Sequence, residues 1–502
     1  MLFNSIEFAF FLPIVFLIYW AIGYAKISDS LKLRVQNAFV VIASYVFYGW
    51  WDWRFLFLIA FTSLCSYASG LLIEKSKTIS KERLAISEKF WLWLNIAVNI
   101  GILAVFKYYD FFTSEFCKLF GISSDGLLIK IILPVGISFY TFQALSYSID
   151  VYRGNIKPTK DIIAFFAFIA FFPQLVAGPI ERATNLLPQF LSNRKFSYEQ
   201  GADGMRQILW GLFKKIVIAD NCALYVNQVW ATYDTQAGST LLLAAVLFTF
   251  QIYGDFSGYS DIAIGTAKLF GIKLMRNFNN PYFSRDIAEF WRRWHISLTT
   301  WFRDYVYIPL GGSRPEVVEG GILNVESKKK FLIARNTFII FLVSGIWHGA
   351  NWTFLAWGAY HALLFLPLIL LGKNRKYTDQ VAEGRLLPTW REALQMLLTF
   401  ALVVIGWIIF RAETIGQAWE YLCDMCQSSV WQLPAIPDVK RFLPIPLMLA
   451  VLVFFEWMNR SRAHGLAIEN YPQWTRRTIY ACILAFIFLF ANQPQTFIYF
   501  QF

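Results

Sequence analysis

The sequence is short of charge and of histidine. Lys, Arg, Asp and Glu make up 16% of the 502 residues, and only four histidines are present. Ordinary globular proteins carry about 25% charged residues, because a globule must cover part of its surface with polar groups. Apolar and aromatic residues reach 57%, and aromatic residues alone reach 19%. This composition excludes a soluble multidomain protein and predicts a polytopic membrane protein.

Several motifs of soluble enzymes are also absent. The chain has no glycine-rich phosphate loop, no G-x-S-x-G elbow and no H-E-x-x-H pair. Of the six cysteines only Cys423 and Cys426 form a C-x-x-C pair, with no second pair or histidine nearby. We therefore interpret that pair as structural and expect neither a bound metal nor a bound cofactor. No internal repeat is visible, which counts against the inverted-repeat transporter folds.

Apolar runs of membrane-spanning length dominate the chain, and we expect roughly ten to twelve spanning helices with re-entrant pieces in one integral-membrane domain over residues 1–502. The runs are Phe8–Tyr24, Val35–Trp51, Trp53–Leu72, Phe90–Phe112, Leu127–Ile149, Ile162–Val176, Leu241–Tyr253, Ser260–Phe270, Phe331–Trp347, Trp352–Leu371, Leu394–Phe410, Phe442–Trp457 and Ile479–Phe490. Basic residues exceed acidic ones by 12 and gather in short segments between the runs, such as Lys328–Lys330 and Lys373–Lys376. This pattern is typical of cytoplasmic loops and does not indicate nucleic-acid binding.

One stretch, Asn277–Gly312, is too charged to face lipid and is rich in Trp and Tyr. At 100° per residue, its aromatic and apolar residues fall on one arc of a single predicted helix, with the Arg and Thr residues opposite and His295 at the boundary. We expect that helix to lie at an interface or to line a polar cavity. Two further stretches, Phe171–Ile180 and Tyr253–Asp261, also have the polar or proline-rich character of cavity walls.

The histidines are the best candidates for chemistry. His348 directly follows an apolar run, where burial favours a neutral imidazole that can act as a general base. Gly345 and Gly349 flank it and would let a substrate approach, although a structural histidine between helices is an equally good interpretation at this point. His295 would bind a polar group of the substrate or lie at the cavity edge. We interpret His361 as structural and assign no role to His464.

Two aspartates, Asp255 and Asp261, give a weaker alternative. They could be interpreted as the carboxylate pair of a glycosidase, but helix caps or polar groups in a cavity wall are the better interpretation.

The motifs resemble those of the membrane-bound O-acyltransferase family, in particular the bacterial branch of alginate O-acetylation and teichoic acid D-alanylation. The matching runs are Glu289–Leu298, Trp301–Gly312, Pro134–Gln143, Ala177–Ile180, Asp255–Asp261, Gly345–Gly349 and the final Phe497–Phe502. The resemblance implies about eleven transmembrane helices around a central tunnel. It also implies that His348 is the essential histidine of the family and His295 the second one.

From that resemblance we expect an acyltransferase of the inner membrane. His348 would take the proton of an acceptor hydroxyl as it attacks a thioester donor, most simply acetyl-CoA, and the acetyl group would pass to an exported polysaccharide through a secreted partner transferase. Transfer of D-alanine or another acyl group from a carrier protein is an alternative. A transporter with cavity histidines, or a scaffold of a secretion machine without chemistry of its own, are alternatives of other classes.

Overall fold

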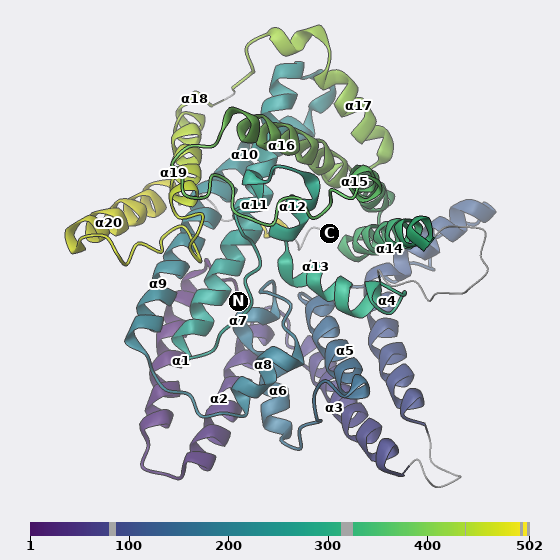
Figure 1. Cartoon of the computed structure of the whole chain (residues 1–502), viewed down its shortest axis with the longest axis vertical. Helices are drawn as coiled ribbons and strands as arrows, with labels where there is room; N and C mark the ends of the chain where they lie inside the picture. Colours follow the sequence, from purple (N-terminus) through teal and green to yellow (C-terminus); the bar gives the residue numbers. More distant parts are fainter. Residues whose placement is uncertain (80–86, 313–324, 437, 492–494, 499–502) are drawn as a thin grey trace. The chain divides into compact units, whose positions relative to one another are not determined.

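The computed structural model describes residues 1–79, 87–312, 325–436, 438–491 and 495–498, and every regular element in these ranges is a helix (Figure 1). Eight of these helices are long and apolar enough to cross a membrane. They are α1 (Ile6–Tyr24), α3 (Phe55–Ile79), α4 (Glu88–Phe120), α11 (Gly238–Leu269), α14 (Val325–His348), α15 (Trp352–Leu370), α16 (Trp390–Arg411) and α19 (Pro444–Met458), the last together with the preceding turn α18 (Val439–Phe442). The expected all-helical, multi-pass architecture is thus confirmed.

The chain forms two compact units. The first contains residues 1–208 and 262–275, and the second contains residues 209–261 and 276–502. Both the α9 helix (Tyr198–Leu212) and α11 contribute residues to each unit.

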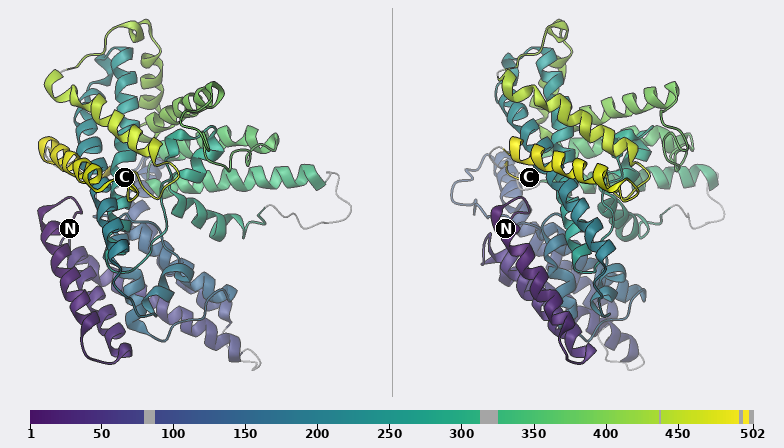
Figure 2. Two further views of the ribbon diagram at one scale, coloured as in Figure 1. Left: turned by 60° about the vertical axis from the view of Figure 1, so that its left-hand side comes forward. Right: turned by 90° about the vertical axis from the view of Figure 1, so that its left-hand side faces the viewer.

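In the first unit, α1 and α2 (Asp29–Gly49) form an antiparallel pair, drawn in purple in Figures 1 and 2. The helices α3, α4 and α5 (Ile137–Arg153) pack against one another and share a buried polar network. Asn95 donates to the Ser148 hydroxyl at 2.8 Å and accepts from the Ser66 hydroxyl at 3.1 Å. Such bonds between helices hold a bundle together where lipid offers no polar partner.

The α5 helix begins ten residues later than the apolar run Leu127–Ile149 suggests. Pro134 lacks an N–H group, and the N-cap Gly136 has φ of +75°. A Cβ atom at Gly136 would collide with the carbonyl oxygen of Leu175. Only glycine fits this close approach, so the backbone turns into the helix there.

The proline-rich stretch 171–180 follows α6 (Ile162–Ala170) and contains only the single turn α7 (Phe172–Leu175) before α8 (Ala183–Phe190). All ten of its residues are buried. The N–H of Phe172 donates to the Ser44 hydroxyl at 3.0 Å, so a neighbouring side chain satisfies this irregular backbone. The expectation of an irregular backbone sheltered by protein is confirmed.

In the second unit, the prediction of two separate spans on either side of the polar stretch 253–261 is wrong. A single helix, α11, runs through this stretch without interruption. Its glycines serve close packing. A Cβ at Gly258 would lie 2.8 Å from the Gly211 carbonyl oxygen, and one at Gly254 would lie 2.9 Å from that of Lys214. Facing these glycines, the backbone widens into the π-helical segment η1 (Phe213–Ala219).

The remaining helices of the second unit are mostly short or amphipathic. They are α10 (Asp220–Ala231), α12 (Ile287–Arg293), α13 (Ile296–Phe302), α17 (Ile415–Met425) and α20 (Gln473–Phe490), with the π-helical turn η4 (Arg303–Tyr307) after α13 and the 3₁₀ turns η2 (Tyr233–Thr235), η3 (Pro281–Phe283) and η5 (Ser428–Trp431). The α14 and α15 helices pack against each other along much of their length.

Candidate active site

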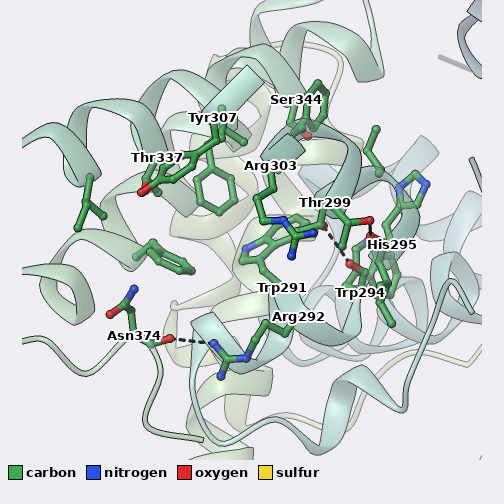
Figure 3. Close-up of a pocket in the computed structure, with 18 of the residues that line it drawn as sticks. Trp291, Arg292, Trp294, His295, Thr299, Arg303, Tyr307, Thr337, Ser344 and Asn374 are labelled. Atoms are coloured by element: carbon green, nitrogen blue, oxygen red, sulfur yellow. Dashed lines mark hydrogen bonds between the residues drawn. The ribbon is translucent and has the colours of Figure 1, made fainter. Parts of the chain in front are cut away.

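A cavity of about 630 Å³ lies within the second unit. Its walls come from α12, α13, η4, α14 and α15 and from the segment that follows α15. Both His295 and His348 line it. Figure 3 shows His295 together with Trp291, Trp294 and Ser344. The structure therefore brings the two predicted histidines, 53 positions apart in the sequence, to the walls of one cavity.

The prediction of a single helix over residues 290–305 is wrong, because the helix is interrupted at Trp294 and His295. His295 has φ of +45° and ψ of 52°, a left-handed conformation that few residues other than glycine adopt. As a result, Arg292, Thr299, Thr300 and Arg303 line the same cavity as the aromatic residues instead of lying opposite them.

Hydrogen bonds of Asn277 and Asn279 stabilise the interruption between α12 and α13. The Asn277 carbonyl accepts from the N–H of Ile296 at 2.9 Å, and its side-chain oxygen accepts from the Ser297 hydroxyl at 2.9 Å. The Asn279 N–H donates to the Arg293 carbonyl at 2.9 Å. Sequence reasoning missed these residues, although the run of asparagines before the helix is a signal of irregular backbone.

His295 is 1% exposed and its ring packs edge-on against Phe256 at 4.7 Å. Burial lowers the pKa of His295 from 6.5 to about 3, so the ring is neutral at pH 7. A neutral imidazole can donate one hydrogen bond and accept another. His295 can therefore hold a polar group at the cavity wall.

His348 is the last residue of α14 and is 6% exposed. Three aromatic rings surround it, those of Trp347 at 4.9 Å, Trp357 at 5.0 Å and Phe410 at 5.2 Å. The Trp347 ring also lies 5.9 Å from His295, so one indole contacts both imidazoles. This aromatic shell fixes the ring of His348 while one side of it faces the cavity.

The sequence suggested that Gly345 and Gly349 let a substrate approach His348. In the structure both glycines instead face Phe354. A Cβ at Gly345 would collide with the Phe354 carbonyl oxygen, and one at Gly349 with the Phe354 ring. Both glycines therefore allow α15 to pack close to the end of α14, which sets the position of His348.

Among the residues that the structure describes, four cations and no carboxylate line the cavity. They are Arg292, Arg303, Lys329 and Arg375, of which the last three are exposed and mark the open end. Arg303 also forms an ion pair with Asp304 at 2.7 Å. The Arg292 guanidinium donates to the carbonyls of Asn374 at 2.8 Å and Tyr377 at 2.6 Å, a contact visible in part in Figure 3. The sequence placed Lys329 and Arg375 only in loops. Their meeting at one cavity needs the tertiary fold.

The two aspartates of α11 take part in buried ion pairs and do not line the cavity. The Lys215 ammonium lies 2.7 Å from Asp255 and 2.8 Å from Asp220, and the Lys214 ammonium lies 2.5 Å from Asp261. Asp255 also accepts from the N–H of Ile498 at 2.7 Å, which fastens the described part of the C-terminal segment, residues 495–498; residues 499–502 of the matching final run lie outside the described residues. Because Asp255 and Asp261 are both paired with lysines, they are not arranged as the carboxylate pair of a glycosidase.

The other histidines and the cysteine pair are not among the lining residues of the cavity. His361 is buried in α15 between the rings of Trp291 at 4.9 Å and Trp357 at 5.1 Å, as a structural residue would be. Cys423 and Cys426 are exposed free thiols on α17 and at its end. Asn351 caps α15, accepting from the Thr353 N–H at 3.0 Å.

These features define a multi-pass membrane protein whose cavity combines two buried imidazoles with a cationic opening. Residues 156–398, which include both histidines, match the model of the MBOAT, membrane-bound O-acyltransferase family. The chain is 40% identical over 440 residues to the probable alginate O-acetylase AlgI of Pseudomonas aeruginosa, covering 86% of this chain and 76% of the relative. The chain belongs to the membrane-bound O-acyltransferase family and is an acyltransferase.

Two other relatives are named for different activities. The peptidoglycan O-acetyltransferase of Helicobacter pylori is 32% identical, over the full length of this chain and 98% of its own. The teichoic acid D-alanyltransferase of Bacillus subtilis is 30% identical over 56% of this chain and 69% of its own. All these relatives carry names of enzymes of the cell envelope or of alginate modification.

Proposed function

We propose that the protein transfers acetyl groups from a cytoplasmic thioester across the inner membrane, for the O-acetylation of an exported polysaccharide. The observation that carries this proposal is the meeting of His348 and His295 at one cavity whose open end is lined by cations. The similarity to an alginate O-acetylase and to a peptidoglycan O-acetyltransferase supports an envelope polysaccharide as the final acceptor and acetyl as the acyl group.

In this proposal His348 is the general base. Its imidazole takes the proton of the acceptor hydroxyl as the hydroxyl oxygen attacks the thioester carbonyl carbon. The C–S bond then breaks, and the imidazolium returns the proton to the departing thiolate, so that the products are an acetyl ester and a free thiol. His295, neutral and rigidly held, positions the donor or the acceptor by a hydrogen bond.

The cations at the open end support a donor that carries phosphate groups. Arg292, Arg303, Lys329 and Arg375 line the cavity, and its described lining residues include no carboxylate, although Arg303 pairs with the neighbouring Asp304. Phosphate oxygens bind clusters of cations through charge-assisted hydrogen bonds. Acetyl-CoA fits this description and is our proposed donor. A carrier-protein thioester, in line with the D-alanyltransferase relative, is the second candidate.

We further propose a secreted transferase as the partner that receives the acetyl group and places it on the polymer. A charged donor cannot cross about 30 Å of hydrocarbon, so the acyl group alone must pass through the protein to the outer side. An enzyme of that side then completes the transfer.

The test is His348→Gln, which keeps a polar side chain of similar length, in cells that make the acetylated polymer. We expect acetyl esters on the polymer to disappear while polymer export and protein level stay unchanged. Ile346→Ala, two residues earlier on the same helix and 46% exposed, is the matched control and keeps normal acetylation. Loss of polymer export would favour a transporter, and normal acetylation in His348→Gln would leave a scaffold without chemistry.

A further inference from the structure

A second cavity of about 290 Å³ lies in the same unit, between α11, η3, α16 and α19. Only Asn280 and Glu456 among its lining residues are neither aliphatic nor aromatic. The Glu456 carboxylate already accepts from the Tyr253 hydroxyl at 2.7 Å. An apolar cavity of about 150 Å³ stays dry and takes up a benzene ring, so this one has room for a hydrocarbon segment.

The cavity opens on the surface that faces the bilayer. Leu397 of α16 and Val453 of α19 line it and are 65% and 39% exposed, and both helices are candidate membrane spans. Their neighbours Leu398 and Phe454 are exposed as well. The medium in contact with this opening is therefore the hydrocarbon of the bilayer.

On both helices the lining residues lie within about 15 Å of one helix end. On α16 they lie six to ten residues after the first residue Trp390, which is about 9–15 Å at 1.5 Å per residue. On α19 it lies two to six residues before the last residue Met458, about 3–9 Å from that end. The Trp457 indole donates to the Leu386 carbonyl at 2.8 Å, which ties the two ends together. The cavity thus lies within one leaflet.

The same ends carry the features of a membrane surface. Trp390 is 83% exposed and Arg391 is exposed beside it at the start of α16. Tryptophan and arginine are typical of the headgroup region, and an arginine there attracts anionic headgroups.

We propose that this cavity binds one acyl chain of a phospholipid of the surrounding leaflet. Apolar lining, exposed lining residues on two candidate spans and leaflet depth match the acyl chain of such a lipid. In this proposal the bound acyl chain also supports the wall of the candidate active site. Tyr282, which lines the lipid cavity, donates to the Thr249 carbonyl at 2.6 Å, and its ring lies 6.0 Å from that of Trp294, the residue before His295.

The experiment uses the full-length protein in nanodiscs that contain phosphatidylglycerol with a photoreactive acyl chain. Leu397→Trp and Val453→Trp each fill the cavity. Leu398→Trp and Leu447→Trp add the same side chain at exposed, non-lining positions of the same helices. We expect both filling variants to reduce cross-linked lipid at least fivefold and both controls to keep it, with wild-type cross-links mapping to α16 and α19.

Equal labelling of filling and control variants would overturn the site. Equal labelling by a free photoreactive fatty acid would overturn the phospholipid. The readout needs no acyl transfer, so it stands or fails independently of the proposed function.

Discussion

At the scale of single residues, the two cavity imidazoles are held by different means. His348 ends a helix and is enclosed by three aromatic rings, whereas His295 sits at a backbone break held by asparagines. A left-handed non-glycine residue costs of order 1–3 kcal/mol and persists only where the surrounding structure fixes it. Placing His295 at the cavity wall therefore costs folding free energy, which is expected of a residue with a function.

The low pKa of His295 makes stability depend on pH. Burial holds the folded pKa at about 3, while the unfolded chain takes up a proton near pH 6.5. Below pH 6.5 the unfolded state binds a proton that the folded state does not, so stability is lost as pH falls, by about 1.4 kcal/mol per pH unit.

The variant His295→Asn removes the titrating group and keeps a side chain that tolerates the left-handed conformation. From pH 7 to pH 5 we expect the wild type to lose roughly 2 kcal/mol more stability than the variant. Thermal unfolding in detergent at the two pH values measures this difference. Parallel losses in both proteins would contradict the buried neutral imidazole.

Sequence reasoning could single out His348 as a candidate because ionisable residues beside apolar runs are rare. The roles of His348 and His295 come from the family resemblance and stay predictions. Sequence reasoning could not see what holds these two histidines. The indole of Trp347 contacts both rings, yet in the sequence it is one of 20 tryptophans. Likewise Lys329 and Arg375 are ordinary loop cations until the fold brings them to one opening.

At the scale of elements, glycines decide how the site helices pack. The Cβ of an alanine at position 358 would collide with the Phe341 carbonyl oxygen, where α15 crosses α14. Gly101 in α4 has no atom within 4 Å of the place of a Cβ. The same substitution thus meets backbone at one position and open space at the other.

We expect Gly358→Ala to destabilise the protein by about 1–3 kcal/mol, as overpacking does, and to reduce acyl transfer by moving His348. Gly101→Ala should be neutral or slightly stabilising, since alanine is the better helix former. Unfolding midpoints of both variants, measured side by side, check this. Equal effects would mean that α14 and α15 are not in backbone contact.

Hydrophobic periodicity located most helices but failed where a local feature overrides it. A period of 3.6 residues continues across His295, because side-chain pattern carries no sign of a positive φ. In the opposite sense, the polar stretch 253–261 reads as a break, yet the partner lysines of η1 satisfy its aspartates inside a continuous helix. Those partners are some 40 residues away in the chain, beyond the reach of a local pattern.

At the scale of the whole molecule, charge predicts orientation. Residues 412–438, between α16 and α18, contain four acidic residues and no Lys or Arg, whereas Lys373, Arg375, Lys376 and Arg385 precede α16. The positive-inside bias therefore places the basic segment in the cytoplasm and residues 412–438 outside it. This orientation also puts the cationic residues Lys329 and Arg375 of the site on the side of a cytoplasmic donor.

The exposed thiols of Cys423 and Cys426 report on this orientation directly. We expect a membrane-impermeant maleimide to label them in intact spheroplasts, and the double variant Cys423→Ser/Cys426→Ser to lose that labelling. Labelling that appears only after the membrane is permeabilised would reverse the orientation.

The most direct test of the central claim uses the purified protein in proteoliposomes with radiolabelled acetyl-CoA at the open end of the cavity. We expect the wild type to release free CoA and to pass label to a hydroxyl acceptor. We expect His348→Gln to do so at least 100-fold more slowly, within the range of about 10²–10⁴ for loss of a general base. The Ile346→Ala control should match the wild type. Transfer at the wild-type rate by a folded His348→Gln protein would contradict the role of His348 as general base.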